Sequence, residues 1–171
     1  DAGRKPYLEP AVLLGAMAAI TRQIRLSTCI MLAPLRPAVL LAKQLTTIDV
    51  ISGGRCEPCF GTGWSREEYA ALNVDYARRR AILRDTIGAC RALWESQPAT
   101  FASDSVSFDG LFQMPRPVQR RIPILLGVKA NPQNAALVAE LCDGWETGPD
   151  DSKSLDRLRE GAALHRAAFA A

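Results

Sequence analysis

The sequence lacks several features that would point to particular classes of protein. It has a single histidine, His165, and aromatic residues make up only 6% of the chain. One histidine excludes a histidine-rich metal cluster and weakens any Ser-His-Asp proposal. The sparse aromatic residues offer no stacking platform for bases, and the net charge of +3 is too small to favour nucleic acid as a partner.

Long apolar runs are also missing. The most apolar stretch, 11–20, is shorter than the roughly 18 residues of a membrane-spanning helix. It also lacks the basic flank and the cleavage site of a secretory signal. We therefore expect no membrane segment. The composition, with 48% hydrophobic and 23% charged residues, is typical of a globular chain.

Cysteine occurs in an odd number, at Cys29, Cys56, Cys59, Cys90 and Cys142. A chain of 171 residues can form a core without disulfides, so we expect mostly free, buried thiols and a cytoplasmic protein. Cys56 and Cys59 have the spacing of a redox or zinc pair, but no second ligand pair follows at a suitable spacing. They also lie within a predicted strand, where residues three apart face opposite sides, so the pattern favours packing.

Helical and strand patterns alternate along the chain. Apolar residues at i, i+3, i+4 and i+7 predict helices, and short apolar runs rich in β-branched residues predict strands. The predicted order is helix 9–22, strand 24–32, helix 39–50, strand 56–63, a helix from the capping box at 65–68 leading into a long helix over 77–95, strand 122–128, helix 131–141, strand 143–147 and helix 152–170. Residues 98–117 are predicted as an excursion of two short strands that turn at Asp109-Gly110.

This alternation predicts the fold class. Strands that are apolar on both faces and separated by helices are typical of parallel β/α units, here four strands in a single α/β domain spanning 1–171. Two architectures fit: an independent four-stranded module, and part of a (β/α)8 barrel, which needs about 250 residues when complete.

Two glycine-containing turns stand where a predicted strand ends and a helix begins. They are Gly61-Thr62-Gly63-Trp64 and Gly127-Val128-Lys129. Glycine lets a flat or anionic ligand approach the backbone, a helix start offers free N–H groups, and Lys129 adds positive charge. Taken alone, the first turn favours tight packing, and Lys129 is equally well explained as a solvated side chain. Neither turn is the dinucleotide fingerprint.

Other polar residues have structural explanations. His165 aligns with the apolar face of the last predicted helix, which favours packing over catalysis. Arg78 to Arg80 are interpreted as a solvated helix face. Glu67 and Glu68 are adjacent and diverge by roughly 100° on a helix, so they do not form an acid–base pair.

Several motifs in order resemble one known family. They are PYLEP at 6–10, TRQIRLSTCIMLAPLRPAVLLAKQLTTIDVISGGR at 21–55, GTGWSREEY at 61–69, and RPVQ followed by IPILLG. Together they resemble the bacterial luciferase-like monooxygenase superfamily, in particular its branch that uses the 8-hydroxy-5-deazaflavin coenzyme F-420. The resemblance implies a (β/α)8 TIM barrel of roughly twice this length. The chain would then be an internal fragment with two strands missing before Asp1, where no initiator Met stands, and about two after Ala171.

The resemblance also implies a cofactor site. Cys29-Ile30 matches a bulge in which a non-proline cis peptide often supports the central ring of the cofactor. Gly61, Thr62, Gly63 and Trp64 match a segment beside the ring system, and Gly127, Val128 and Lys129 match the turn near the phosphate-bearing tail. No metal site and no catalytic residue is implied, because the family's general acids tend to come from the first two strands, which are absent.

The chain departs from the family pattern in three places. Val128 stands where a second glycine is usual and would narrow the approach to the backbone. Arg36-Pro37-Ala38 replaces a common Arg-His-Pro segment, and Cys56-Glu57-Pro58-Cys59 replaces a smooth apolar strand, which puts the geometry of that strand in question.

We therefore expect an oxidoreductase that transfers a hydride between reduced deazaflavin and a small organic substrate. The enzyme alternative uses FMN and oxygen for monooxygenation. A third hypothesis is a non-catalytic barrel remnant that associates through its exposed edges, for example as a homodimer.

Overall fold

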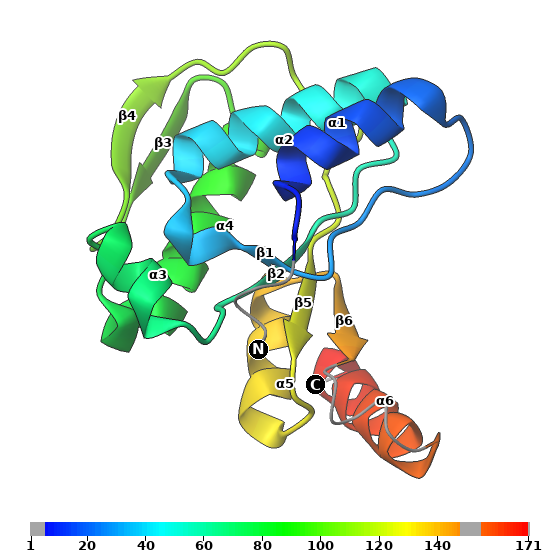
Figure 1. The fold of residues 1–171 in the computed structure, drawn as a ribbon. Coiled ribbons are helices and arrows are strands. Elements are labelled where there is room, and N and C mark those ends of the chain that lie inside the picture. Colours follow the sequence, from blue (N-terminus) through cyan, green and yellow to red (C-terminus); the bar gives the residue numbers. More distant parts are fainter. Residues whose placement is uncertain (1–5, 148–154, 171) are drawn as a thin grey trace.

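A computed structural model describes residues 6–147 and 155–170 of the chain as helices that alternate with four short parallel strands (Figure 1). The strands are β1 (Met31–Leu32), β2 (Cys59–Gly61), β5 (Leu125–Val128) and β6 (Gly144–Thr147), and they lie in the order β1-β2-β5-β6. Every neighbouring pair is parallel. The predicted fold class is confirmed: successive β/α units form a partial (β/α)8 barrel.

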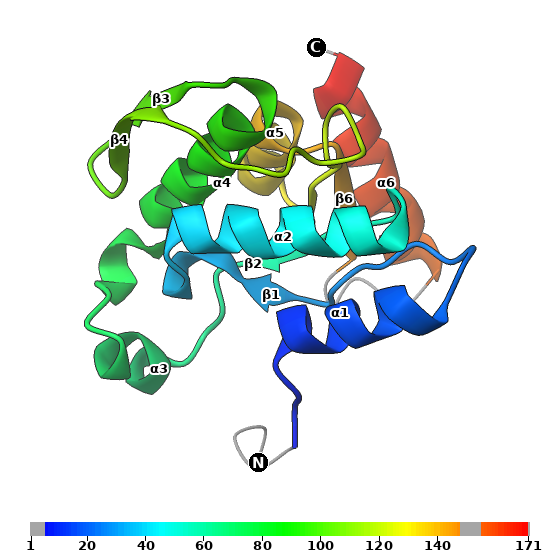
Figure 2. The ribbon, with the colours of Figure 1, turned by 90° about the horizontal axis from the view of Figure 1, so that it is seen from above.

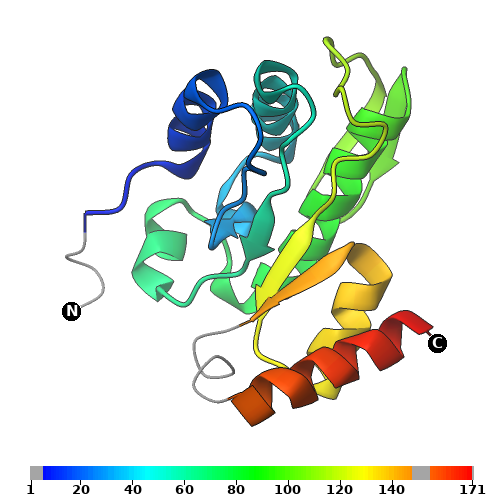
Figure 3. The same cartoon turned by 90° about the vertical axis from the view of Figure 1, so that its right-hand side faces the viewer.

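Apart from the short helix that follows β2, the helices of the described residues lie on the outer side of this sheet (Figure 3). They are α1 (Pro10–Ile20), α2 (Ala38–Ser52), α3 (Arg66–Ala71), α4 (Arg79–Glu95), α5 (Pro132–Leu141) and α6 (Leu155–Ala170), with short 3-10 turns η2 (Ala33–Leu35) and η3 (Tyr76–Arg78). Figure 2 shows α1 and α2 side by side, and Figure 3 shows α1, α2, α4, α5 and α6 following one another in an arc. The predicted helix over 152–170 is described only from Leu155 onward.

The ends of the helices follow from local sequence signals. The hydroxyl of Ser65 accepts a hydrogen bond from the Glu68 N–H at 3.2 Å, which confirms the predicted cap of α3. The side chain of Asn131 caps α5 in the same way, with Pro132 in the first turn. Helix α2 ends at Gly53, whose φ of 69° lies in the left-handed region that glycine adopts freely.

The first strand is shorter than the predicted range 24–32. Leu26 forms an isolated bridge to Cys56, and regular pairing resumes only at Met31. Between them the hydroxyl of Thr28 donates to the Cys59 carbonyl at 2.7 Å and accepts from the Cys59 N–H at 3.1 Å. A side chain thus replaces the backbone ladder, and the local pattern of apolar residues could not reveal this.

The second strand is also shorter than predicted. Pro58 has no N–H to donate, and regular pairing of β2 begins only after it. The Pro58 carbonyl still accepts from the Leu125 N–H at 2.9 Å, so the strand stays in register with β5.

The excursion after α4 is an antiparallel hairpin of β3 (Ala99–Ala102) and β4 (Ser107–Leu111). The predicted turn at Asp109-Gly110 is wrong, because these two residues lie inside β4. The turn instead spans 103–106, where the Ser103 hydroxyl accepts the Val106 N–H at 3.1 Å. Thr100 on the facing strand bonds Asp109 at 2.8 Å, which holds Asp109-Gly110 within an irregular stretch of the ladder.

The core lies between the sheet and the arc of helices. It includes Leu41, Leu45, Phe60, Ile87, Trp94, Ile124 and Leu126, all almost fully buried. Arg55 connects the first two helices at the edge of this core. Its guanidinium donates to the carbonyls of Ala18, Thr21, Ile24 and Ser52. These bonds tie the end of α1 to the end of α2.

His165 is buried on α6 and stacks on Trp145 with ring centroids 4.4 Å apart, which confirms its predicted packing role. The five cysteines are free thiols, four of them buried and Cys29 exposed. No helix in the described part of the chain combines the length and apolar character that crossing a bilayer requires.

Candidate cofactor site at the carboxyl ends of the strands

The three segments that the sequence predicts for the site converge: Cys29-Ile30 directly precede β1, Gly61 ends β2, and Gly127 lies in β5. A Cβ built on Gly61 would lie 2.1 Å from Ile30 Cδ1 and 3.5 Å from the Gly127 carbonyl oxygen. A Cβ on Gly127 would lie 2.4 Å from Ile30 Cγ2. Ile30, Gly61 and Gly127 are therefore in mutual contact. The Cys29–Ile30 peptide bond is cis, as the resemblance implies.

The two glycines admit the Ile30 side chain. A methyl group at either position would occupy space that Ile30 fills, so glycine is needed here for packing within the protein. Sequence reasoning weighed the approach of a ligand against tight packing and, for the first turn taken alone, favoured packing. The structure stacks Ile30 over two strand ends, and Ile30 is the partly buried surface that a bound group would meet.

The turn after β2 is held by a buried tyrosine. The hydroxyl of Tyr69, which is 1% exposed, donates to the Thr62 carbonyl, and burial raises the pKa of Tyr69. Gly63 has a φ of 68° and lies against Leu32. Trp64 is 70% exposed, so its indole is free to cover a ligand at this rim.

The turn after β5 is equally well defined. The Val128 carbonyl accepts the Trp145 indole N–H at 2.7 Å, and the Lys129 carbonyl accepts the Asn134 amide at 2.8 Å. The Val128 side chain packs against the hydrophobic core. It therefore does not narrow the approach to the Gly127 backbone, which was the concern raised by the missing second glycine.

A cation missed by sequence reasoning joins this turn. Arg80 donates to the Asn134 side chain at 3.2 Å, which brings its guanidinium to the first turn of α5. Pro132 has no N–H and the Asn131 cap takes the Asn134 N–H, so the Gln133 N–H, the Arg80 guanidinium and the exposed Lys129 are the groups near the start of α5 that favour an anion. The sequence pattern favours a solvated face for Arg78 to Arg80, because no local signal shows that α4 reaches α5.

A carboxyl group missed by sequence reasoning lies on the inner face of the sheet. Glu146 of β6 pairs in register with Gly127, and its carboxyl group lies close to the thiols of Cys29 and Cys59. The hydrogen bond to Glu146, together with partial burial, raises the pKa of Cys29. Burial and then Glu146 raise the pKa of Cys59. No motif marks Glu146, since β6 has only four residues.

These features fit a flat, partly anionic cofactor. An apolar platform at Ile30, an exposed indole and a cationic helix start occupy one end of the sheet, where α/β barrels bind ligands. The described residues contain no group of three His, Cys, Asp or Glu side chains that could hold a metal ion.

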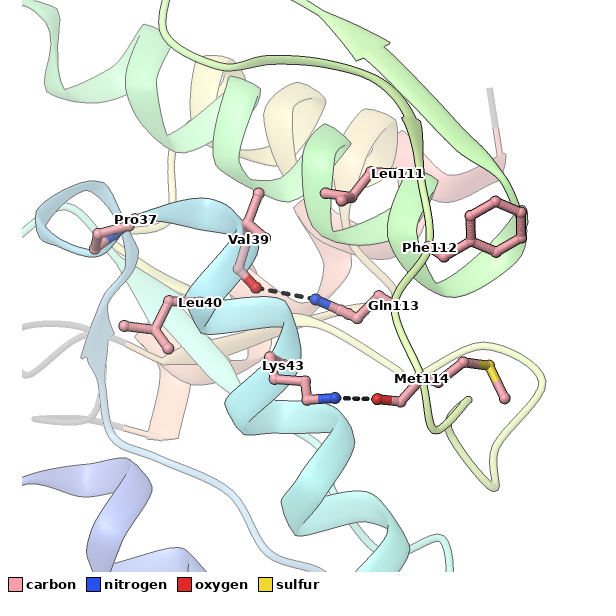
Figure 4. A pocket seen from close by; sticks show the side chains of 8 residues that line it. All are labelled: Pro37, Val39, Leu40, Lys43, Leu111, Phe112, Gln113 and Met114. Carbon is pink, nitrogen blue, oxygen red and sulfur yellow. Dashed lines mark hydrogen bonds between the residues drawn. The ribbon is translucent and has the colours of Figure 1, made fainter.

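Two surface pockets lie apart from the strand-end platform. One, of about 540 Å³, is lined by Val39, Leu40 and Lys43 of α2 and by Leu111 to Met114, and its walls are bridged by Gln113 Nε2 donating to the Val39 carbonyl at 3.0 Å (Figure 4). The other, of about 410 Å³, lies between α4 and α5. Neither is lined by Ile30, Gly61 or Gly127.

The chain is similar to known proteins along most of its length. Residues 2–171 match the family model described as luciferase-like monooxygenase. The uncharacterized protein Rv0953c of Mycobacterium tuberculosis is 38% identical over 144 residues, which are 84% of this chain and 51% of that protein. The chain thus spans about half the length of the curated relatives of this kind that it matches.

Solved structures show the same relationship. The monooxygenase RslO1 of Streptomyces bottropensis superposes with a TM-score of 0.85 at 27% identity, over 95% of this chain and 49% of that one. Two more distant structures share the fold. An F420-dependent secondary alcohol dehydrogenase in complex with an F420-acetone adduct has a TM-score of 0.73 at 23% identity, covering 93% and 50% of the two chains. The oxygenating constituent of 3,6-diketocamphane monooxygenase of Pseudomonas putida in complex with FMN has a TM-score of 0.77 at 16% identity, covering 94% of this chain and 48% of that one.

Proposed function

The chain belongs to the luciferase-like monooxygenase family, and from this premise we propose that it forms the cofactor-binding part of a flavin- or deazaflavin-dependent oxidoreductase. The observation that carries the proposal is the convergence of Ile30, Gly61 and Gly127 beside the cationic start of α5. We propose the deazaflavin coenzyme F-420 as the cofactor and hydride transfer to or from a small organic substrate as the reaction.

The residues of this chain would divide the work of binding. Ile30 would support one face of the ring system, and Trp64 would cover its edge and exclude water. Lys129, Arg80 and the Gln133 N–H in the first turn of α5 would hold the anionic tail. The bound coenzyme would supply the hydride chemistry, while the protein contributes orientation and a dry surface.

FMN-dependent monooxygenation is the second candidate function. It is favoured by the similarity to the monooxygenase RslO1 and by the FMN bound in the diketocamphane enzyme. The two candidates differ in their reaction with oxygen, so oxygen uptake during turnover would favour FMN, and turnover without uptake would favour the deazaflavin.

A titration tests the proposal. Coenzyme F-420 and FMN are added separately to the chain, and binding is followed by the fluorescence of the coenzyme. We expect Lys129→Met to weaken binding about tenfold, or roughly 1.4 kcal/mol, as expected for one charge-assisted contact. The matched control is Arg120→Met, an exposed arginine that precedes β5 and so lies at its other end.

The outcomes separate the hypotheses. Saturable binding that weakens with salt and depends on Lys129 supports the proposal. If neither coenzyme changes its fluorescence at high micromolar protein, the chain does not bind as proposed, and the non-catalytic remnant is favoured.

A further inference from the structure

Glu146 is directed toward the inner face of the sheet. Its neighbour Trp145 points outward, where its ring stacks on His165 of α6. Successive side chains of a strand alternate between faces, so Glu146 lies on the face that also carries Gly127, its partner in register. Because Gly127 has no side chain, nothing on β5 separates the carboxyl group from the platform at Ile30.

The partners of Glu146 are unusual for a partly buried carboxylate. Its carboxyl group lies beside two thiols, Cys29 and Cys59, and thiols are weak hydrogen-bond donors. Within residues 6–147 and 155–170 it forms no ion pair with a lysine or arginine. Removal of a carboxylate from water is costly, and in a purely structural role it is normally offset by a cation or by strong donors.

The surroundings define which substrates this carboxyl group suits. Cys29 is exposed and Cys59 is fully buried, so a substrate can approach the Glu146 carboxyl group from the side of Cys29. The negative charge there repels an anionic substrate. A neutral molecule with a hydroxyl or carbonyl oxygen could both reach the carboxyl group and exchange a proton with it.

We propose that Glu146 exchanges a proton with the oxygen of a neutral alcohol or carbonyl substrate bound over Ile30 and Cys29. This assignment rests on the proposed function. In the oxidative direction the substrate O–H bond breaks and its proton forms an O–H bond on the Glu146 carboxylate. The adjacent C–H bond breaks, its hydrogen leaves with both electrons as a hydride to the bound deazaflavin or flavin, and the substrate keeps a C=O double bond. In the reductive direction the hydride returns to the carbon and the proton returns from Glu146 to the oxygen.

The first test needs no cofactor. The thiolate of Cys29, the one exposed cysteine, attacks iodoacetamide and displaces iodide, and mass spectrometry of the digest measures the rate of this alkylation at pH 8. Glu146→Gln removes the negative acceptor beside this thiol. We expect alkylation of Cys29 to become about two- to fivefold faster, the effect of one partly exposed charge contact. Glu160→Gln, an exposed glutamate of α6, is the control and should leave the rate unchanged. An unchanged rate in a folded Glu146→Gln variant would overturn the placement of the carboxyl group.

The second test uses the chain loaded with coenzyme F-420 or FMN. Glu146→Gln should bind the coenzyme as tightly as the unmodified chain but transfer a hydride to or from a neutral alcohol or carbonyl probe, such as isopropanol or acetone, about 100-fold more slowly. If the unmodified chain binds no coenzyme, the proposed function fails and this assignment fails with it. If it binds and reacts, and Glu146→Gln reacts equally fast, only the role of Glu146 is refuted.

Discussion

Replacement of Gly127 by alanine tests the packing on which the site depends. The new Cβ would lie 2.4 Å from Ile30 Cγ2 and 3.3 Å from Cys59 Sγ. Carbon atoms in contact are normally about 3.5–4.0 Å apart, so Ile30 would have to move by more than 1 Å. Its Cγ2 is fixed by the β-branch and cannot swing away without a change of χ1. Overpacking of this kind costs about 1–3 kcal/mol.

Two matched substitutions set the scale. Gly15→Ala lies in α1 with no atom within 4 Å of the new methyl group, so it should stabilise the chain by about 0.5–1 kcal/mol. Gly61→Ala also meets Ile30, but at the terminal Cδ1, which can rotate away. We therefore expect Gly61→Ala to cost less than Gly127→Ala, although the new Cβ at Gly61 would lie closer to Ile30, at 2.1 Å.

A double-mutant cycle measures the contact directly. Ile30→Ala opens the space over the strand ends, so the cost of Gly127→Ala should fall by at least about 1 kcal/mol in that background. Urea unfolding followed by circular dichroism gives the four free energies of unfolding. If the two substitutions add within about 0.5 kcal/mol, Ile30 does not lie over Gly127 and the proposed platform is wrong.

Three further predictions concern the scaffold. Arg55→Lys should lower the free energy of unfolding by about 2 kcal/mol, because an ammonium group cannot reach the four carbonyls that the guanidinium ties together; a loss below 0.5 kcal/mol in urea would contradict this. Burial raises the pKa of the Cys56, Cys90 and Cys142 thiols from the ordinary value of 9.0 to about 12. The contribution of these neutral thiols to the free energy of unfolding is therefore complete below pH 9.0. It is lost as the pH rises from there toward 12, by about 1.4 kcal/mol per pH unit for each thiol. Urea midpoints at pH 8 to 11 should fall more steeply for the unmodified chain than for Cys90→Ala. Burial opposes ionisation of Asp143, but hydrogen bonds from Arg91 and from the Ile124 N–H hold its pKa below the ordinary value of 3.8. The contribution of this carboxylate to the free energy of unfolding is therefore present above that value and is lost as the pH falls through the lowered pKa. Asp143→Asn should flatten the dependence of the free energy of unfolding on pH between pH 5 and pH 2. An unchanged pH dependence would count against the ion pair with Arg91.

Local signals in the sequence determined the order of the elements. Strands that are apolar on both faces must be covered on both sides, so their alternation with amphipathic helices required parallel β/α units. Ser65, Asn131 and Gly53 marked helix ends correctly because capping involves only neighbouring residues. The Cys29–Ile30 bulge followed from the resemblance and not from the residues themselves.

Where tertiary contacts compete with local preference, sequence reasoning failed. Asp109-Gly110 is a strong turn signal, yet the bond between Thr100 and Asp109 and the cap formed by Ser103 moved the turn to 103–106. The hydroxyl of Thr28 likewise interrupts the predicted first strand, since it takes the place of a ladder partner on β2.

The sequence by itself determined the βα order, the turns at Gly61 and Gly127 and the positive charge at Lys129, because each depends on a few consecutive residues. Only the tertiary structure decided that Ile30 fills the space above both glycines, that Arg80 reaches the start of α5, and that Glu146 faces the thiols of Cys29 and Cys59. These contacts join residues far apart in the chain. Their physical cause is the parallel register of the strands, which brings distant carboxyl ends to one edge of the sheet.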